Sequence, residues 1–209
     1  MTTPVDLLVL DVHGVVLNNP FRTFLRTLAT RTEQDPVELE TRWDEELRLP
    51  TWLGRTGDAE LWSALLGRDA LPRSSAWWRA RLEGTYALGP AAPLLERWHE
   101  HVSIWLLSNH RASWLKPRLD RMGLDAHVDR VLVSDELGAV KPAPEAFEPI
   151  LRAYPDPSRV LFVDDQLHNV TAARSFGLRA VHLQPDERSL RVIDKLVRHQ
   201  HVERHVRAV

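Results

Sequence analysis

The sequence predicts an α/β fold, a doubly wound parallel sheet with a small helical cap domain inserted after the first strand. Three observations support this prediction. From residue 103 onward, short apolar runs alternate with helix-like segments, which is typical of a parallel sheet with right-handed crossovers. Residues 18–90 contain helix-like segments only. Polar residues follow several apolar runs, where open α/β sheets bind their ligands.

The composition narrows the class of protein. The chain has 209 residues, of which 44% are apolar and 27% charged, as in ordinary globular proteins. A net charge of −2 gives no reason to expect nucleic acid or a membrane surface as a partner. There are no cysteines, which excludes disulfides and cysteine-bound metals. The first apolar run has four residues, too short for a signal peptide or a membrane span, so we expect a cytoplasmic protein. The sequence does not specify the oligomeric state.

The core elements follow from apolar runs and helical spacing. Five runs have the length of buried parallel strands: Leu7–Leu10, Ser103–Leu107, Val131–Val133, Val160–Val163 and Ala180–Leu183. Helical spacing covers Trp114–Met122, Glu145–Ala153 and Asn169–Phe176, and Gly123 and Gly177 stand where C-terminal capping glycines occur. A last helix is expected from Ser189. Its His199, His201 and His205 face different sides, which favours solvated histidines over a metal site.

The stretch between the first and second strands is the predicted cap. Its four helix-like segments are Phe21–Thr30, Pro36–Leu47, Asp58–Leu66 and Ser74–Tyr86. It also holds five of the eight tryptophans. We interpret these mainly as packing between helices, with the lining of a substrate pocket as the alternative. The predicted division is therefore a core of residues 1–17 and 91–209 and a cap of residues 18–90.

Chemically useful side chains end several predicted strands. Asp11 ends the first, Ser108 and Asn109 the second, and Asp164 and Asp165 the fourth, while Lys141 lies in a loop ahead of it. Clustered carboxylates need a cation among them, and oxygen ligands suit Mg²⁺. A lysine and a hydroxyl can hold phosphoryl oxygens, and an aspartate can attack phosphorus. Each residue alone has a structural explanation as a helix cap or turn, but their joint occurrence favours a phosphoryl-transfer site.

These motifs together resemble the haloacid dehalogenase (HAD) superfamily, in its subfamily with a helical cap after the first motif. The matching stretches are Asp11–Val15, Leu107–Asn109, Lys141–Phe147, and Phe162–Asp165 with Asn169. The resemblance implies a Rossmann-like core in which Asp11 is the nucleophile and Ser108, Asn109 and Lys141 bind the substrate phosphoryl group. It also implies that Asp11, Asp165 and the backbone carbonyl of His13 bind Mg²⁺, with Asp164 as a further ligand or as the partner of Lys141.

His13 departs from the family pattern, in which phosphatases usually have a second, acid–base aspartate. In the favoured hypothesis His13 replaces that aspartate, and the chain is a Mg²⁺-dependent hydrolase of small phosphate monoesters with an aspartyl-phosphate intermediate. Among Asp11, Asp164 and Asp165, its imidazole is expected to keep its proton, an effect that Mg²⁺ would oppose.

Two alternatives to the phosphatase hypothesis stay open. The first is a binding or regulatory protein that has lost turnover. The second is a metal-independent dehalogenase-type hydrolase, which the paired Asp164 and Asp165 disfavour. His110 could face the site but is better explained as a turn or helix-start residue. Arg55 and Arg73 could meet an anionic substrate, but nothing distinguishes them from the many other arginines.

Overall fold

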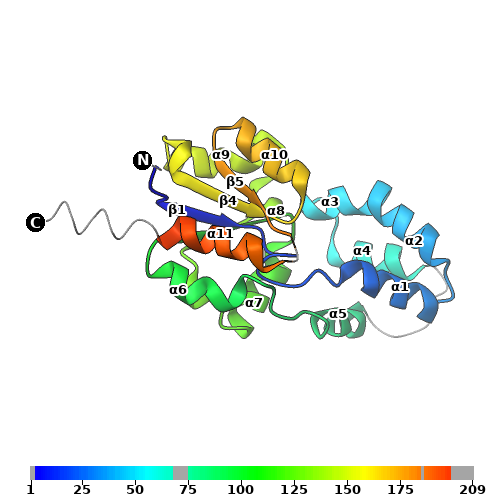
Figure 1. Ribbon diagram of the computed structural model, residues 1–209. Helices are drawn as coiled ribbons and strands as arrows, with labels where there is room; N and C mark the ends of the chain where they lie inside the picture. The colour runs from blue at the N-terminus through cyan, green and yellow to red at the C-terminus, as the bar shows by residue number, and fades with distance from the viewer. Residues whose placement is uncertain (1–2, 68–74, 185, 199–209) are drawn as a thin grey trace, which may run out of the picture.

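A parallel sheet forms the centre of the molecule (Figure 1). The computed structural model describes residues 3–67, 75–184 and 186–198. In this part of the chain, five strands pair in the order β3-β2-β1-β4-β5, all parallel. Their bounds are β1 Leu7–Leu10, β2 Ser103–Ser108, β3 Arg130–Val133, β4 Val160–Asp164 and β5 Arg179–His182. The doubly wound α/β fold expected from the sequence is confirmed.

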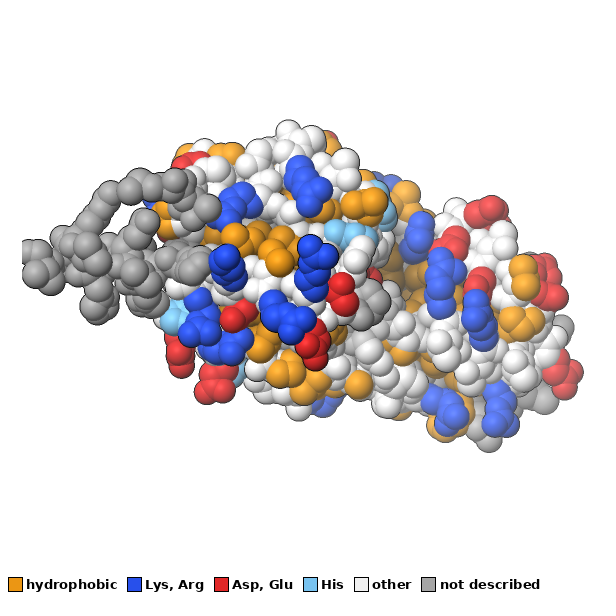
Figure 2. All heavy atoms as spheres, viewed as in Figure 1, with side chains coloured by type: hydrophobic (Ala, Val, Ile, Leu, Met, Phe, Trp, Pro, Cys, Tyr) orange, Lys and Arg blue, Asp and Glu red, His pale blue; other side chains and the backbone are white. Residues whose placement is uncertain are grey.

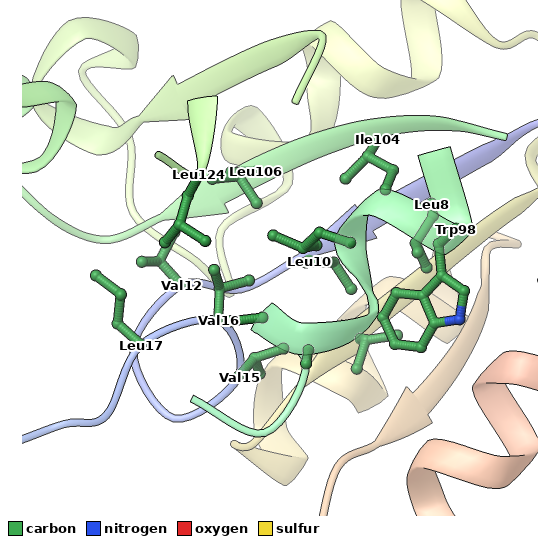
Figure 3. Close-up of a cluster of buried hydrophobic side chains, with 14 of the residues drawn as sticks. Leu8, Leu10, Val12, Val15, Val16, Leu17, Trp98, Ile104, Leu106 and Leu124 are labelled. Atoms are coloured by element: carbon green, nitrogen blue, oxygen red, sulfur yellow. The ribbon is translucent and has the colours of Figure 1, made fainter. Parts of the chain in front are cut away.

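Helices cover both faces of this sheet (Figure 1). They are α6 (Leu95–His99), α7 (Ala112–Arg121), α8 (Ser134–Leu137), α9 (Pro144–Ala153), α10 (Leu167–Ser175) and α11 (Glu187–Arg198). Leu8 and Leu10 point to one face, where they pack in a cluster that includes Trp98 of α6 (Figure 3). Leu7 and Val9 point to the other, among residues of α9 and α10. Because both faces are covered, the strands are apolar throughout rather than alternating.

The cap helices pack around a second hydrophobic cluster, which also includes Trp114 of α7. The elements of the cap are α1 (Phe21–Arg31), α2 (Pro36–Arg42), a π-helical turn (Trp43–Leu47), α3 (Arg48–Trp52), α4 (Asp58–Leu66) and α5 (Ser75–Glu83). Trp43, Trp62 and Trp78 are buried in this cluster with Phe24, which agrees with helix packing as their main role. The segment expected as one helix over Pro36–Leu47 instead runs on through the π-helical turn into α3. Such turns are often found at functional sites.

Two short segments join the cap to the sheet domain. The Asn18 side chain donates to the carbonyl of Thr85 and accepts from the amide of Ala87, so the outgoing and returning segments are tied together. Gly89 lies against the backbone of Val15 and Val16, and a Cβ there would lie 2.6 Å from a carbonyl oxygen. The predicted division of the chain, with residues 18–90 as a separate cap domain, agrees with these contacts and stays a prediction.

Some elements differ from the prediction. The helices α6 and α8 were not expected, because each is only one or two turns long and carries too few apolar residues to show a period. The last helix begins at Glu187 rather than Ser189, and His199, His201 and His205 lie outside the described residues, as does Arg73. Among the described helices, none combines the length and apolar character that crossing a bilayer requires.

Candidate active site

Three carboxylates meet at the carboxyl edge of the sheet. Asp11 follows β1, Asp164 ends β4, and Asp165 is the next residue. One carboxylate oxygen from each lies within 4.8 Å of the other two. This convergence arises because β1 and β4 are parallel neighbours and end side by side. Oxygen-only ligands at this spacing are suited to a hard divalent cation.

Lys141 supplies the compensating charge. Its Nζ lies 2.6 Å from Oδ1 of Asp11 and 2.7 Å from Oδ2 of Asp164. Burial disfavours the ammonium ion, but these two carboxylates outweigh it and raise the pKa of Lys141 above its ordinary 10.5. Burial raises the pKa of Asp11 from 3.8 to about 7, although the ion pair with Lys141 opposes the shift. The nucleophile expected from the sequence is thus a buried carboxylate held by a buried ammonium.

Asp164 and Asp165 have different surroundings. The Asp164 carboxylate accepts hydrogen bonds from Lys141, from the Asn169 side chain and from the Gln166 amide, so its oxygens are fully engaged. Oδ1 of Asp165 is buried without a hydrogen-bond partner. Burial, followed by the nearby Asp164, raises its pKa above 3.8. An unpaired buried carboxylate oxygen needs a partner, and a divalent cation fits this position.

Ser108 and Asn109, at the end of β2, have different hydrogen-bonding roles. Oγ of Ser108 is buried and has no hydrogen-bond partner, so it is free to donate to a ligand in the cavity. The Asn109 side chain accepts from the Lys141 amide at 2.8 Å and donates to the Lys141 carbonyl at 2.9 Å. Both ends of the Asn109 amide are therefore used to fix the Lys141 loop. Asn109 also lines the cavity, and its expected contact with a substrate stays a prediction.

The pKa of His13 is shifted in the direction opposite to the one expected from the sequence. Its pKa lies well below 6.5 because the ring is buried and because His110, Arg118 and Lys141 add positive potential. The ring stacks on His110 with centroids 4.6 Å apart, and its Nε2 lies 3.3 Å from Nη1 of Arg118. Sequence spacing suggested acidic neighbours, whereas the folded chain surrounds the ring with cationic and neutral ones.

The structure tests the remaining candidates from the sequence and adds Arg118, which the sequence did not indicate. His110 lines the cavity, although the sequence favoured a role as a turn or helix-start residue. Arg55 is exposed and does not line the cavity. Arg118 was missed because nothing in the sequence marks it among the other arginines. It lies on α7 and belongs to no recognisable motif, and only the packing of α7 brings it to His13.

A cavity of about 660 Å³ lies between the cap and the carboxyl edge of the sheet. The core contributes Asp11, Ser108 and Lys141 to its lining, while the cap contributes the aromatic rings of Trp43 and Trp52. In Figure 2, apolar side chains lie in a recess at the narrow junction between the two parts. The cavity is large enough for a small metabolite, and two cap tryptophans line it in addition to their packing role.

The match to a family model covers most of the chain. The model, described as haloacid dehalogenase-like hydrolase, matches residues 5–177. The chain belongs to this family of hydrolases.

Two named relatives match about half of the chain. The ribulose-1,5-bisphosphate 5-phosphatase of Halopiger xanaduensis is 35% identical over 124 residues, which are 58% of this chain and 52% of that protein. The pyrimidine 5′-nucleotidase of Escherichia coli is 31% identical over 111 residues, 52% of this chain and 49% of that protein. The chain thus spans about half the length of the relatives it matches.

Solved structures share the fold. A predicted HAD-like family hydrolase of Porphyromonas gingivalis superposes with a TM-score of 0.73 at 22% identity, covering 95% of this chain and 100% of that one. A HAD family enzyme of Bacteroides thetaiotaomicron, in complex with magnesium and inorganic phosphate, gives 0.69 at 18% identity, covering 86% and 94%. At such identities the likeness establishes the fold alone.

Proposed function

We propose that the chain is a Mg²⁺-dependent phosphatase that forms an aspartyl-phosphate on Asp11. The observation that carries this proposal is the group formed by buried Asp11, Asp164 and Lys141 with half-buried Asp165 at the floor of the cavity. A structural role alone would not explain a buried carboxylate oxygen of Asp165 and a buried hydroxyl of Ser108 that both lack partners. Both have a use if a cation and a phosphoryl group bind there.

The residues divide the chemical work. Mg²⁺ would be held by Asp11, Asp165 and the His13 carbonyl. Asp164 lies beside them as the partner of Lys141. The bound ion would offset charge on the phosphoryl oxygens and favour the ionised form of Asp11. Asp11 attacks phosphorus. Lys141 and Ser108 hold the phosphoryl oxygens while charge is redistributed. Asn109 acts by fixing the Lys141 loop.

The substrate is proposed to be a small phosphorylated metabolite. The cavity volume suits such a molecule. The names of the two relatives concern a sugar bisphosphate and a pyrimidine nucleotide, which agrees with a phosphate ester as the substrate class. The absence of a nucleic-acid partner and a cytoplasmic location stay predictions.

The test is hydrolysis of para-nitrophenyl phosphate, with MgCl₂ and with EDTA, by the wild type and by Asp11→Asn. We expect metal-dependent turnover that falls by at least about 10²-fold in the variant, since the nucleophile is lost. As a matched control, Asp129→Asn changes a carboxylate far from the cavity and leaves turnover unchanged. Turnover of a haloacid that EDTA does not affect would favour the dehalogenase alternative. Absence of turnover on any substrate, with phosphate still bound, would favour the binding protein.

A further inference from the structure

Aromatic rings form one wall of the cavity, and the transfer of a phosphoryl group does not use them. The rings come from both the cap and the core, and all of them line the cavity: Phe21, Trp43, Trp52, Tyr86 and His110. A phosphoryl group fills only a small part of a cavity of about 660 Å³. The rest of the space receives the group that is esterified to the phosphoryl group, and the aromatic wall is part of what that group contacts.

The aromatic wall runs from the phosphoryl site into the cap. His110 stands two residues after Ser108, and its ring stacks on Trp52 with centroids 4.8 Å apart. The ring of Trp52 meets that of Trp43 edge-on at 5.4 Å, and Trp43 contacts Phe21 at 4.5 Å. These rings therefore form an unbroken series of contacts that begins beside the residue proposed to hold the phosphoryl oxygens.

Trp52 is held at the middle of the aromatic wall by its backbone. Its carbonyl oxygen accepts a hydrogen bond from Oγ of Ser134 at 2.5 Å, which ties the end of α3 to α8 of the core. Leu49, on the same helix, also lines the cavity and is 52% exposed. Apolar and aromatic surface of this kind gains free energy when a ligand removes it from water. Helix α3 thus offers apolar surface to a ligand in the cavity.

Polar side chains beside the aromatic wall are engaged with the protein. Both ends of the Asn109 amide bind the backbone of Lys141. Nδ1 of His110 lies 3.2 Å from the carbonyl oxygen of Arg111. A sugar or another polyhydroxylated group that gave up its water here would leave hydroxyls without full replacement of their hydrogen bonds, which is costly.

The other polar side chains of the cavity do not change this conclusion. Three of them line the cavity but are exposed: Asn19, Gln166 and His168. Hydrogen bonds from exposed groups replace bonds to water and give little net gain. Oδ1 of Asn169 is buried without a partner, but its side chain binds Asp164 at the floor, where the phosphoryl group is proposed to bind.

The charged residues on the cap side balance one another. Among the described cap residues that line the cavity, two are arginines and two are acids: Arg22, Arg48, Asp44 and Glu45. Both arginines pair with Asp44, at 2.8 Å from Arg22 and 3.1 Å from Arg48, and Arg22 also lies 3.6 Å from Glu40. A second phosphate would have to break these pairs and would meet Glu45. The cap side therefore has no surplus charge, among these residues, for a second anionic group.

We infer that the cap side of the cavity is a binding subsite for a flat, uncharged ring attached to the phosphoryl group. The substrate is then the phosphate monoester of a small ring-bearing alcohol or phenol, rather than a sugar phosphate or a bisphosphate. Trp52 contacts the ring and determines this specificity. The inference rests on the proposed function and narrows its substrate class.

The experiment compares phosphate esters of primary alcohols, which have similar leaving groups and differ in what the alcohol carries. The quantity measured is kcat/KM for 2-phenylethyl phosphate, glycerol 3-phosphate and propane-1,3-diol bisphosphate. In the wild type we expect kcat/KM for the phenylethyl ester to exceed both others by about tenfold or more. The difference should lie mainly in KM, because contacts with the ring are made in the ground state as well as in the transition state.

Binding is also measured without turnover. Calorimetric titration in MgCl₂ compares benzylphosphonate with hydroxymethylphosphonate, neither of which has a phosphate ester bond to hydrolyse. We expect benzylphosphonate to bind the wild type about tenfold more tightly. In Trp52→Leu this advantage should fall to about twofold or less, and KM for the phenylethyl ester should rise with kcat kept. The contact with Ser134 is kept in this variant because it uses the carbonyl oxygen of residue 52.

The control is Trp77→Leu. Trp77 is another cap tryptophan, is 36% exposed and does not line the cavity, so the preference for the ring should be unchanged. An unchanged preference in Trp52→Leu would overturn the assignment of Trp52. If Trp52→Leu fails to fold, the wild-type comparisons and Phe21→Leu still decide whether the ring subsite exists.

The results separate this inference from the proposed function. Equal kcat/KM for the phenylethyl and glycerol esters, or equal affinity for the two phosphonates, would refute the ring subsite and leave the phosphatase standing. Faster turnover of the bisphosphate would also overturn the inference. Tight binding of benzylphosphonate, with no metal-dependent turnover of any ester, would support the subsite and refute the phosphatase. Neither binding nor turnover would refute both.

Discussion

Gly14 lies against the carboxylate that is best placed for the metal, which makes Gly14→Ala an informative substitution. Its φ is +98°, and a Cβ built on it would lie 2.2 Å from Oδ2 and 2.6 Å from Cγ of Asp165. To restore an ordinary contact of 3.4 Å, Oδ2 would have to move by about 1.2 Å. Metal–oxygen distances tolerate about 0.2 Å, so the displaced carboxylate no longer matches the cation site.

The expected effects follow from this displacement. Removing groups that only support a metal ligand already weakens affinity by about 10–100-fold, so the Mg²⁺ concentration for half-maximal activity should rise by at least this factor. Alanine at a positive φ should also cost about 1–3 kcal/mol of unfolding free energy. Calorimetric titration with Mg²⁺ measures the affinity, and urea unfolding in EDTA measures the stability.

Gly123→Ala is the matched control. Gly123 has a φ of +66°, and a Cβ there would meet nothing within 4 Å. This variant should therefore lose stability through its backbone alone, with no change in Mg²⁺ affinity. If Gly14→Ala bound Mg²⁺ as tightly as Gly123→Ala does, the assignment of Asp165 as a metal ligand would be refuted.

Three further predictions concern Lys141, His110 and the contact between cap and core. Lys141→Met should lower the unfolding free energy by about 3–5 kcal/mol, because it leaves buried carboxylates without their cation, and urea unfolding measures this. The pKa of His110 is lowered from 6.5 to about 3 by burial and by Arg118, so on acidification His110 takes up a proton in the unfolded chain before it does so in the folded one. The contribution of His110 to the unfolding free energy is therefore fully present above pH 6.5. As the pH falls from 6.5 to 3, the wild type should lose up to about 1.4 kcal/mol per pH unit of this contribution, whereas His110→Phe should not. Asp58→Asn should weaken the hydrogen bond from Trp114 Nε1 to Asp58 and the ion pairs of Asp58 with Arg79 and Arg111. Amide exchange in α4 should then be faster than in the wild type, while exchange in β2 should be unchanged.

Each of these predictions has a contradicting outcome. Unchanged stability of Lys141→Met would mean that the carboxylates are neutral or solvated in the folded protein. Parallel pH–stability curves for the wild type and His110→Phe would mean that His110 is not held neutral by the fold. Equal exchange rates in α4 of Asp58→Asn and the wild type would mean that the cap is held by its other contacts.

Much of the fold was accessible from the sequence because its signals are local. The run at Val160–Val163 is apolar without interruption, which is typical of a strand that is covered on both faces. Gly123 and Gly177 have positive φ, as expected of glycines that end helices. Short elements such as α8 were missed because one turn of helix has no period to detect. The π-helical turn at Trp43–Leu47 was missed because a helical pattern does not show an extra residue within a turn.

The sequence by itself determined which groups could do chemistry and at which edge of the sheet they gather, because strand ends are encoded in local patterns and parallel strands end at one edge. It placed Asp11, Lys141 and Asp165 together on that basis. Only the tertiary structure decided the state of His13. The cation that contacts it comes from α7 and is held by a carboxylate of the cap, Arg118 and Glu83. The pKa of a buried ring depends on its neighbours in space, and no spacing along the chain specifies which neighbours those are.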